Sequence, residues 1–263
     1  MKALKDQDFP WWLVAVGGIG ALLFYQVWAS EVYSSAMRLL AKGIWLTIFV
    51  TVVAYAMACA LGLLLALAGL SRFRSVRQAA RFYIEVVRGV PIMVLLLYVA
   101  FVAAPGAIYG WNWLMAHLGL EPVKTRDFPL LWRAIIALTL AYSAFLAEVF
   151  RAGLQAVDKG QIEAAQALGL SGWQRFRHVM FPQAFRMILP PLGNDLVAMV
   201  KDSSLVSVLG VADITQLGKV TAAGNFRYFE TYNLVALLYL TMTVGLSLVL
   251  RRIEARLKAR DQR

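Results

Sequence analysis

Cysteine, histidine and charged residues are scarce in this 263-residue sequence, which has one cysteine, two histidines and 16% charged residues. The single cysteine, Cys59, has no partner for a disulfide bond or for a cysteine metal site. His117 and His178 are too few and too far apart to suggest a metal cluster. The Gly-x-x-x-x-Gly-Lys-[Ser/Thr] pattern of nucleotide-binding loops is absent, and no nucleophile–base–acid set is recognisable. We therefore expect no catalytic residue, metal or cofactor in this chain.

Apolar residues are abundant, since 60% of the chain is hydrophobic and the mean hydropathy is +0.66. A helix that crosses a bilayer needs ~20 apolar residues. The sequence therefore predicts an all-α integral membrane protein, folded as a single domain over residues 1–263, with about six transmembrane helices. The predicted spans are Trp11–Ala29, Gly43–Ser71, Gly89 to about Ala104, Ala134 to about Phe150, an interrupted one from Met187 to Ala212, and Thr231–Leu250.

The basic residues cluster between these spans. A net charge of +11 would suggest a nucleic-acid partner in a soluble protein, but this distribution argues against one. If the amino terminus is cytoplasmic, 18 of the 26 lysines and arginines lie in cytoplasmic segments and seven lie outside. This excess follows the positive-inside rule and predicts that both termini are cytoplasmic.

The first apolar segment, within residues 1–30, has two interpretations. It follows two lysines, and Val27-Trp28-Ala29 faintly resembles a signal-peptide cleavage site. Asp6 and Asp8 dilute the positive charge that precedes it, and the segment is long enough to cross a bilayer. We favour an uncleaved additional helix.

Proline and glycine predict two interruptions in the helical pattern. Between Pro105 and Pro129 the breakers, together with Trp111 and Trp113, suggest a short interfacial hairpin on the outer surface. Pro190-Pro191 predicts a break before the fifth span.

The cytoplasmic segment 158–186 is too polar for lipid and has the pattern of two short helices. Asp158 and Gln161 have the spacing of a helix N-cap with its N3 partner, and Ser171 with Gln174 repeats that spacing. Gly169 stands where a helix C-terminal glycine accepts positive φ. The pattern predicts a helix-turn-helix that is exposed in the cytoplasm and docks another protein.

Several motifs in this region resemble those of a known family. Glu163-Ala164-Ala165, then Gly169, then Val179-Met180-Phe181-Pro182 resembles the EAA signature of membrane subunits of ATP-binding-cassette (ABC) importers. Four further motifs are similar to the polar amino-acid branch of these permeases, which carries histidine, glutamate, glutamine, arginine or opines: Arg88-Gly89-Val90-Pro91, Ala147-Glu148-Val149-Phe150-Arg151, Leu192-Gly193-Asn194, and Lys201-Asp202-Ser203-Ser204-Leu205 before Gly210-Val211. The resemblance covers residues 43–250.

The resemblance implies a five-helix importer core over residues 43–250, with the helix in residues 1–30 as an addition. It implies a bacterial inner-membrane location, a second permease subunit that is identical or related, an extracytoplasmic solute-binding protein and a polar amino acid as cargo. A pair of cytoplasmic ATPases would bind ATP and magnesium and contact the EAA loop. The residues implied in this contact are Glu163, Ala164, Ala165, Gly169 and Pro182. Taken alone, Glu163 can also be a solvated first-turn glutamate.

Charged residues inside the spans are candidates for the substrate pathway, because a buried charge costs at least ~2.5 kcal/mol at the bilayer centre. An amino acid carries an ammonium, which Glu148 or Asp202 can pair, and a carboxylate, which Lys201 can pair. Ion pairs within the chain are a strong alternative explanation, in which Glu148 pairs with Arg151 and Lys201 pairs with Asp202 or Asp195. The candidates are Glu148, Asp195, Lys201, Asp202 and Ser203.

Two other classes of protein fit the sequence less well. A secondary transporter or channel would work without an ATPase, but the paired discontinuous spans of such folds are not evident. A membrane enzyme would need a reactive set of residues, which is also not evident.

Overall fold

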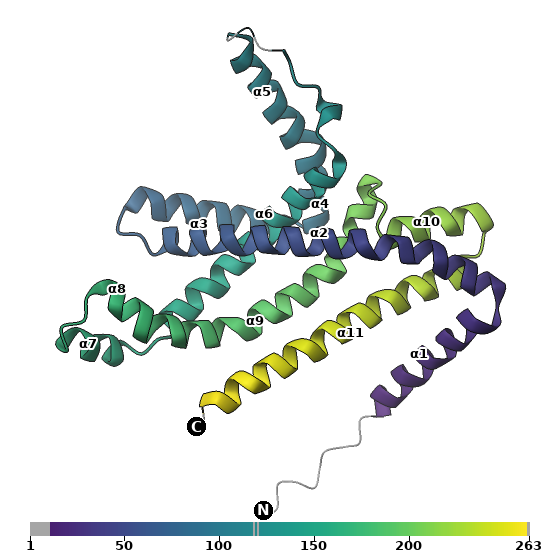
Figure 1. Cartoon of the computed structure of the whole chain (residues 1–263). Coiled ribbons are helices and arrows are strands. Elements are labelled where there is room, and N and C mark those ends of the chain that lie inside the picture. The colour runs from purple at the N-terminus through teal and green to yellow at the C-terminus, as the bar shows by residue number, and fades with distance from the viewer. Residues whose placement is uncertain (1–10, 118, 120, 262–263) are drawn as a thin grey trace, which may run out of the picture.

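The computed structural model describes residues 11–117, 119 and 121–261, and its long and short helices assemble into one bundle (Figure 1). No strand occurs among these residues, and the predicted all-α class is confirmed. Within the described residues, four helical stretches are long and apolar enough to cross a bilayer: Glu31–Gly69, Ile92–Ala116, Leu130–Gln155 and Tyr228–Arg256.

The first predicted span is α1 (Trp11–Ala29), a helix of 19 residues with no charged residue. The fifth predicted span is also helical but less clearly membrane-spanning. In α9 (Phe181–Asp202) charged side chains interrupt the apolar pattern. The count of six transmembrane helices therefore stays a prediction.

The centre of the bundle is the contact between α2 (Glu31–Gly69) and α6 (Leu130–Gln155). Small residues make this contact close, because a Cβ added at Gly62 would lie 3.0 Å from the Cβ of Leu146. Helices that associate within a membrane use small residues in this way to bring their backbones together. Four buried small residues recur at every fourth position of α2: Ala54, Ala58, Gly62 and Ala66.

The third span differs from the prediction. It begins after an amphipathic helix, α3 (Arg74–Gly89), and continues through three consecutive segments instead of ending near residue 104. The first part of the predicted surface hairpin after Pro105 is helical, as α5 (Ala104–Ala116), which projects away from the bundle (Figure 1). Its position at the outer surface stays a prediction. The π turn directly before Pro105 relieves the backbone clash that proline causes in a regular helix. The three segments are α4 (Ile92–Tyr98), the π turn η1 (Val99–Ala103) and α5 (Ala104–Ala116).

The fifth span also differs. Pro190-Pro191 lies inside α9, and the predicted break at this position is wrong, because a membrane helix tolerates proline where neighbouring elements satisfy the freed backbone groups. The α-helix ends at Asp202, before the predicted Ala212. A 3-10 turn, η4 (Ser203–Leu209), follows it.

At the end of the bundle opposite α7 (Lys159–Ala167) and α8 (Gly172–Arg175) lies α10 (Ile214–Asn225), packed against α2 and α11 (Tyr228–Asp261) (Figure 1). Asp213 caps α10 by accepting a hydrogen bond from the Gln216 N–H at 2.8 Å. Its other carboxylate oxygen accepts one from the Tyr239 hydroxyl at 3.0 Å. This buried aspartate therefore links α10 to α11.

Candidate coupling segment and polar interior

Both helix caps predicted in segment 158–186 are present. Asp158 Oδ1 accepts from the Gln161 N–H at 3.1 Å and starts α7 (Lys159–Ala167). Ser171 and Gln174 form a reciprocal capping box, in which the Ser171 N–H donates to Gln174 Oε1 at 2.9 Å. This box starts α8 (Gly172–Arg175), which continues through the π turn η3 (Phe176–Met180) into α9. The second short helix is thus the beginning of the fifth span and not a separate element.

Gly169 makes the turn between α7 and α8 with φ = +77°. Two backbone hydrogen bonds close the end of α7, from the Leu170 N–H to the Ala165 carbonyl at 3.2 Å and from the Gly169 N–H to the Gln166 carbonyl at 3.0 Å. This pair of bonds is a Schellman motif, which requires a residue in the left-handed region at the position that Gly169 occupies.

The segment is held rigidly on the bundle. Ala165 is buried, and Ile162 packs against a small apolar cluster formed by Val157 with residues of α9. Two side-chain hydrogen bonds connect α7 to the helix that follows, Arg175 to Gln166 at 2.8 Å and Gln183 to Gln161 at 2.5 Å. Both apolar packing and side-chain hydrogen bonds therefore connect α7 to the helix that follows it.

The outer side of the segment is free for contact with another protein. Glu163 and Ala164 are exposed, and among the described residues Glu163 makes no ion pair. Leu168 is 81% exposed and Trp173 is 69% exposed, so two large apolar side chains lie on the surface of this segment. Pro182, at the start of α9, is half-buried and therefore less accessible than Glu163 and Ala164.

The polar candidates in α9 are partly brought together. The Tyr142 hydroxyl of α6 donates to Asp202 Oδ2 at 2.7 Å, and Asp195 lies half-buried two turns earlier on α9. Lys201 is exposed and pairs with neither aspartate. The buried Ser203 Oγ donates to the Val200 carbonyl at 2.7 Å, so its hydroxyl is already engaged.

Glu148 lies apart from these residues, near the end of α6, where Arg151 Nε donates to its carboxylate at 3.1 Å. The ion pair within the helix is therefore the contact that the structure contains. Two tyrosines near the aspartates escaped the sequence analysis, namely Tyr142 and Tyr55, whose hydroxyl donates to the Leu192 carbonyl at 2.6 Å. A tyrosine in an apolar helix gives no local signal of a partner that lies elsewhere in the chain.

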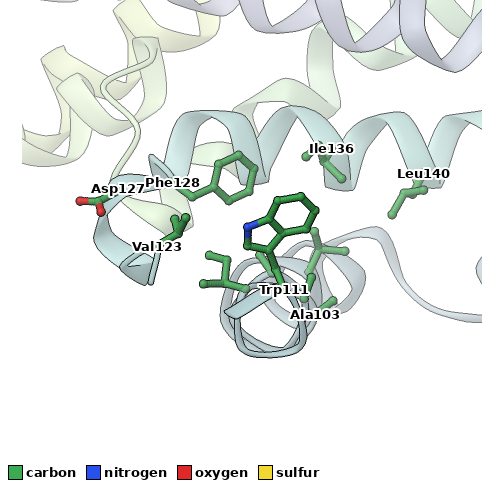
Figure 2. A pocket seen from close by; sticks show the side chains of 11 residues that line it. Ala103, Trp111, Val123, Asp127, Phe128, Ile136 and Leu140 are labelled. Carbon is green, nitrogen blue, oxygen red and sulfur yellow. The ribbon is translucent and has the colours of Figure 1, made fainter. Parts of the chain in front are cut away.

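A separate cavity of about 550 Å³ lies between α5 and α6. Figure 2 shows Trp111 of α5 pointing toward Ile136 and Phe128, with Asp127 as the polar group at its edge. Because the remaining lining is apolar, this cavity lacks the paired charges that a zwitterionic amino acid needs.

Comparisons with known proteins match most of the chain. The family model for the binding-protein-dependent transport system inner membrane component matches residues 58–260. The glutamine transport system permease protein GlnP of Escherichia coli K12 is 36% identical over 85% of this chain and 94% of its own length. The arginine transport system permease protein ArtQ of Bacillus subtilis is 31% identical over 84% of this chain and 93% of its own.

Solved structures agree with these relatives. A crystal structure described as an amino acid ABC transporter with histidines has a TM-score of 0.70 and 35% identity, and the match covers 83% of this chain and 94% of that one. An inward-facing structure of the MetNI methionine ABC transporter has a TM-score of 0.64 at 21% identity, over 87% and 99% of the two chains, and supports the fold alone.

Proposed function

Since the chain belongs to the family of binding-protein-dependent transport system inner membrane components and is a permease subunit of the amino-acid ABC type, not an enzyme, we propose that segment 158–186 couples it to a separate ATPase. The observation that carries this proposal is the shape of that segment. It is stiffened by two caps and a Schellman turn, attached to α9, and exposed at Glu163, Ala164, Leu168 and Trp173.

The coupling residues have distinct roles in this proposal. Glu163 and Ala164 contact the ATPase, since a charged group beside a small one allows close approach with a defined polar anchor. Ala165 and Pro182 attach the segment to the rest of the bundle, and Ala165 is buried there. Gly169 sets the angle of the turn. Closure of two ATPases on ATP and magnesium then moves α7 together with α9 and rocks the spans, as in rigid-body transport mechanisms.

The aspartates on α9 are proposed as the ammonium-binding part of the pathway for a polar amino acid. Asp202 is oriented by the Tyr142 hydroxyl, and Asp195 lies on the same helix two turns earlier. Lys201 is exposed without a carboxylate partner and can receive the substrate carboxylate, with Ser203 next to it at the end of α9. Intramembrane charges of this kind usually face the interior of a transporter.

The proposed assembly contains a second permease subunit, a pair of cassette ATPases and an extracytoplasmic solute-binding protein, in the inner membrane of a bacterium. Both termini and segment 158–186 face the cytoplasm. This orientation rests on the excess of lysine and arginine in the segments between spans.

A cysteine experiment tests the coupling proposal, because Cys59 is the single cysteine of the chain. In a Cys59→Ala background, Ala164→Cys is expected to cross-link to the partner ATPase and to react with a membrane-impermeant maleimide from the cytoplasmic side. Ser34→Cys, near the start of α2, is the matched control and is expected to do neither.

Uptake of radiolabelled amino acids into vesicles that contain the assembled transporter completes the test. We expect uptake to require ATP and the ATPase. Uptake by this chain alone, without ATP, would support the alternative of a secondary transporter or channel. Labelling of Ala164→Cys from the outside would contradict the coupling role itself.

A further inference from the structure

A second cavity, of about 370 Å³, lies at the end of the bundle that leads to segment 158–186. It is partly open to solvent and is lined by the last turns of α2, one face of α3 and the last turns of α6. Unlike the cavity in Figure 2, it has mainly polar walls. The charged and polar side chains that line it are Arg81, Glu85, Arg88, Glu148, Arg151 and Gln155.

The α6 side chains in this cavity are already paired. Arg151 Nε donates to Glu148 at 3.1 Å, and Arg151 Nη1 donates to Gln155 Oε1 at 2.7 Å. This network satisfies both charges of α6 within one helix. A ligand would therefore meet the remaining charges, which belong to α3.

The α3 side chains lack such pairing. Arg81, Glu85 and Arg88 follow one another at i,i+4 and i,i+3, the spacing of helical ion pairs, yet no salt bridge joins them within the described part of the chain. Arg88 lies over the ring of Phe145, with its guanidinium carbon 5.7 Å from the ring centre. Ile84, between these residues, is 5% exposed and fixes this face of α3 toward the bundle.

The unpaired groups match both ends of an α-amino acid. Two guanidiniums offer planar pairs of N–H donors, which suit a carboxylate, and Glu85 offers an acceptor for an ammonium. Leu65, Leu70 and Ile84 add an apolar wall against which a side chain can lie. The volume is at the small end of the range for ligand pockets, which favours a small molecule.

We propose that this cavity is a second binding site for a free α-amino acid, separate from the aspartates of α9. Arg81 and Arg88 bind its carboxylate and Glu85 binds its ammonium. Two parts of this proposal rest on the proposed function: that the ligand is the transported amino acid, and that the site faces the cytoplasm. On that side the site holds amino acid after its release from the pathway.

Binding to the complete transporter in phosphatidylcholine nanodiscs tests the site. Each of the twenty L-amino acids is screened for thermal stabilisation of the complex, and the most stabilising one is then used as a radiolabelled probe in equilibrium dialysis. We expect two bound molecules per permease chain. Arg88→Gln and Glu85→Gln are each expected to weaken one of the two by tenfold or more, and Arg88→Lys is expected to weaken it less. Arg74→Gln, in the first turn of α3 and outside the cavity, is the control and should bind as the unmodified chain does.

Asp202→Asn separates this proposal from the pathway proposal, because it should weaken only the other bound molecule. One bound molecule that is insensitive to Arg88→Gln and Glu85→Gln but lost in Asp202→Asn would overturn the second site and leave the proposed function intact. The proposal would also be overturned if phosphatidylglycerol nanodiscs stabilised the complex in a way that depends on Arg88 while no amino acid bound at the cavity. In that case the arginines would bind a lipid headgroup. Normal binding with impaired ATP-driven uptake in Arg88→Gln would overturn it in favour of a structural role.

Discussion

Replacing Gly169 by alanine gives the sharpest test of the coupling segment. At φ = +77° a Cβ conflicts with the backbone itself, although no other atom lies within 4 Å of the added carbon. The left-handed conformation costs an L-residue about 1–2 kcal/mol. At 1.4 kcal/mol for each factor of ten, the closed turn becomes about 5 to 30 times less populated relative to open alternatives. Opening also breaks the two hydrogen bonds that end α7, each worth about 1 kcal/mol.

The matched control is Gly172→Ala, three residues further along the same segment. Gly172 has no positive φ, and the nearest atom to its added Cβ is a terminal nitrogen of Arg175 at 3.9 Å, which is an ordinary contact. Alanine is therefore accommodated at the start of α8 and is expected to be neutral or slightly stabilising.

The assay compares the two variants in vesicles with the ATPase and the binding protein present. We expect Gly169→Ala to lower ATP-driven uptake at least fivefold and to make the segment more sensitive to limited proteolysis, while Gly172→Ala retains normal values for both. Equal uptake and equal proteolysis in the two variants would refute the reasoning, because it would mean that the bend at Gly169 is not needed for coupling.

Three other substitutions probe the bundle and the pathway. Gly43→Ala places a Cβ 2.6 Å from the backbone nitrogen of Ile214, so α2 and α10 must separate. We expect the free energy of unfolding to fall by about 1–3 kcal/mol, measured as a lower Tm in detergent. Gly69→Ala is the control and should leave the Tm unchanged, because no atom lies within 4 Å of its added Cβ. Arg133→Met removes the donors to three backbone carbonyls, of which the Ala100 carbonyl is in a buried hydrogen bond. Leaving that carbonyl unpaired costs about 1–3 kcal/mol of unfolding free energy, so the Tm should fall, and an unchanged Tm would contradict this role of Arg133. Tyr142→Phe removes the hydroxyl that donates to the Asp202 carboxylate and orients it. We expect the KM for uptake to rise about tenfold at unchanged Tm. An unchanged KM would exclude Asp202 from the pathway.

Local chemistry could be predicted from the sequence because its rules act over three or four residues. The cap at Asp158, the box at Ser171 and the turn at Gly169 each depend on neighbours within one helical turn, and each is present in the structure. The helical character of the apolar segments follows equally from short-range periodicity. The exposed position of Glu163 agrees with the polar pattern around it.

Long-range partners could not be predicted in this way. Tyr142 and Asp202 are 60 residues apart, and Arg133 reaches the Ala100 carbonyl across 33 residues. The distance between such groups depends on how closely the helices pack, which a single sequence does not specify. The alternative that Lys201 pairs with an aspartate is likewise not seen among the described residues, where Asp202 instead accepts a hydrogen bond from the Tyr142 hydroxyl.

The placement of α6 explains how coupling and transport can depend on each other. This one helix carries Tyr142, which orients Asp202, and Glu148, which lines the polar cavity, and it ends at Gln155, three residues before the Asp158 cap. Small residues of α2 allow it to pack closely along α6. A displacement of segment 158–186 is therefore expected to shift both polar sites relative to α3 and α9. Substitutions that loosen the contact between α2 and α6, far from either site, should consequently reduce ATP-driven uptake more than they reduce amino-acid binding.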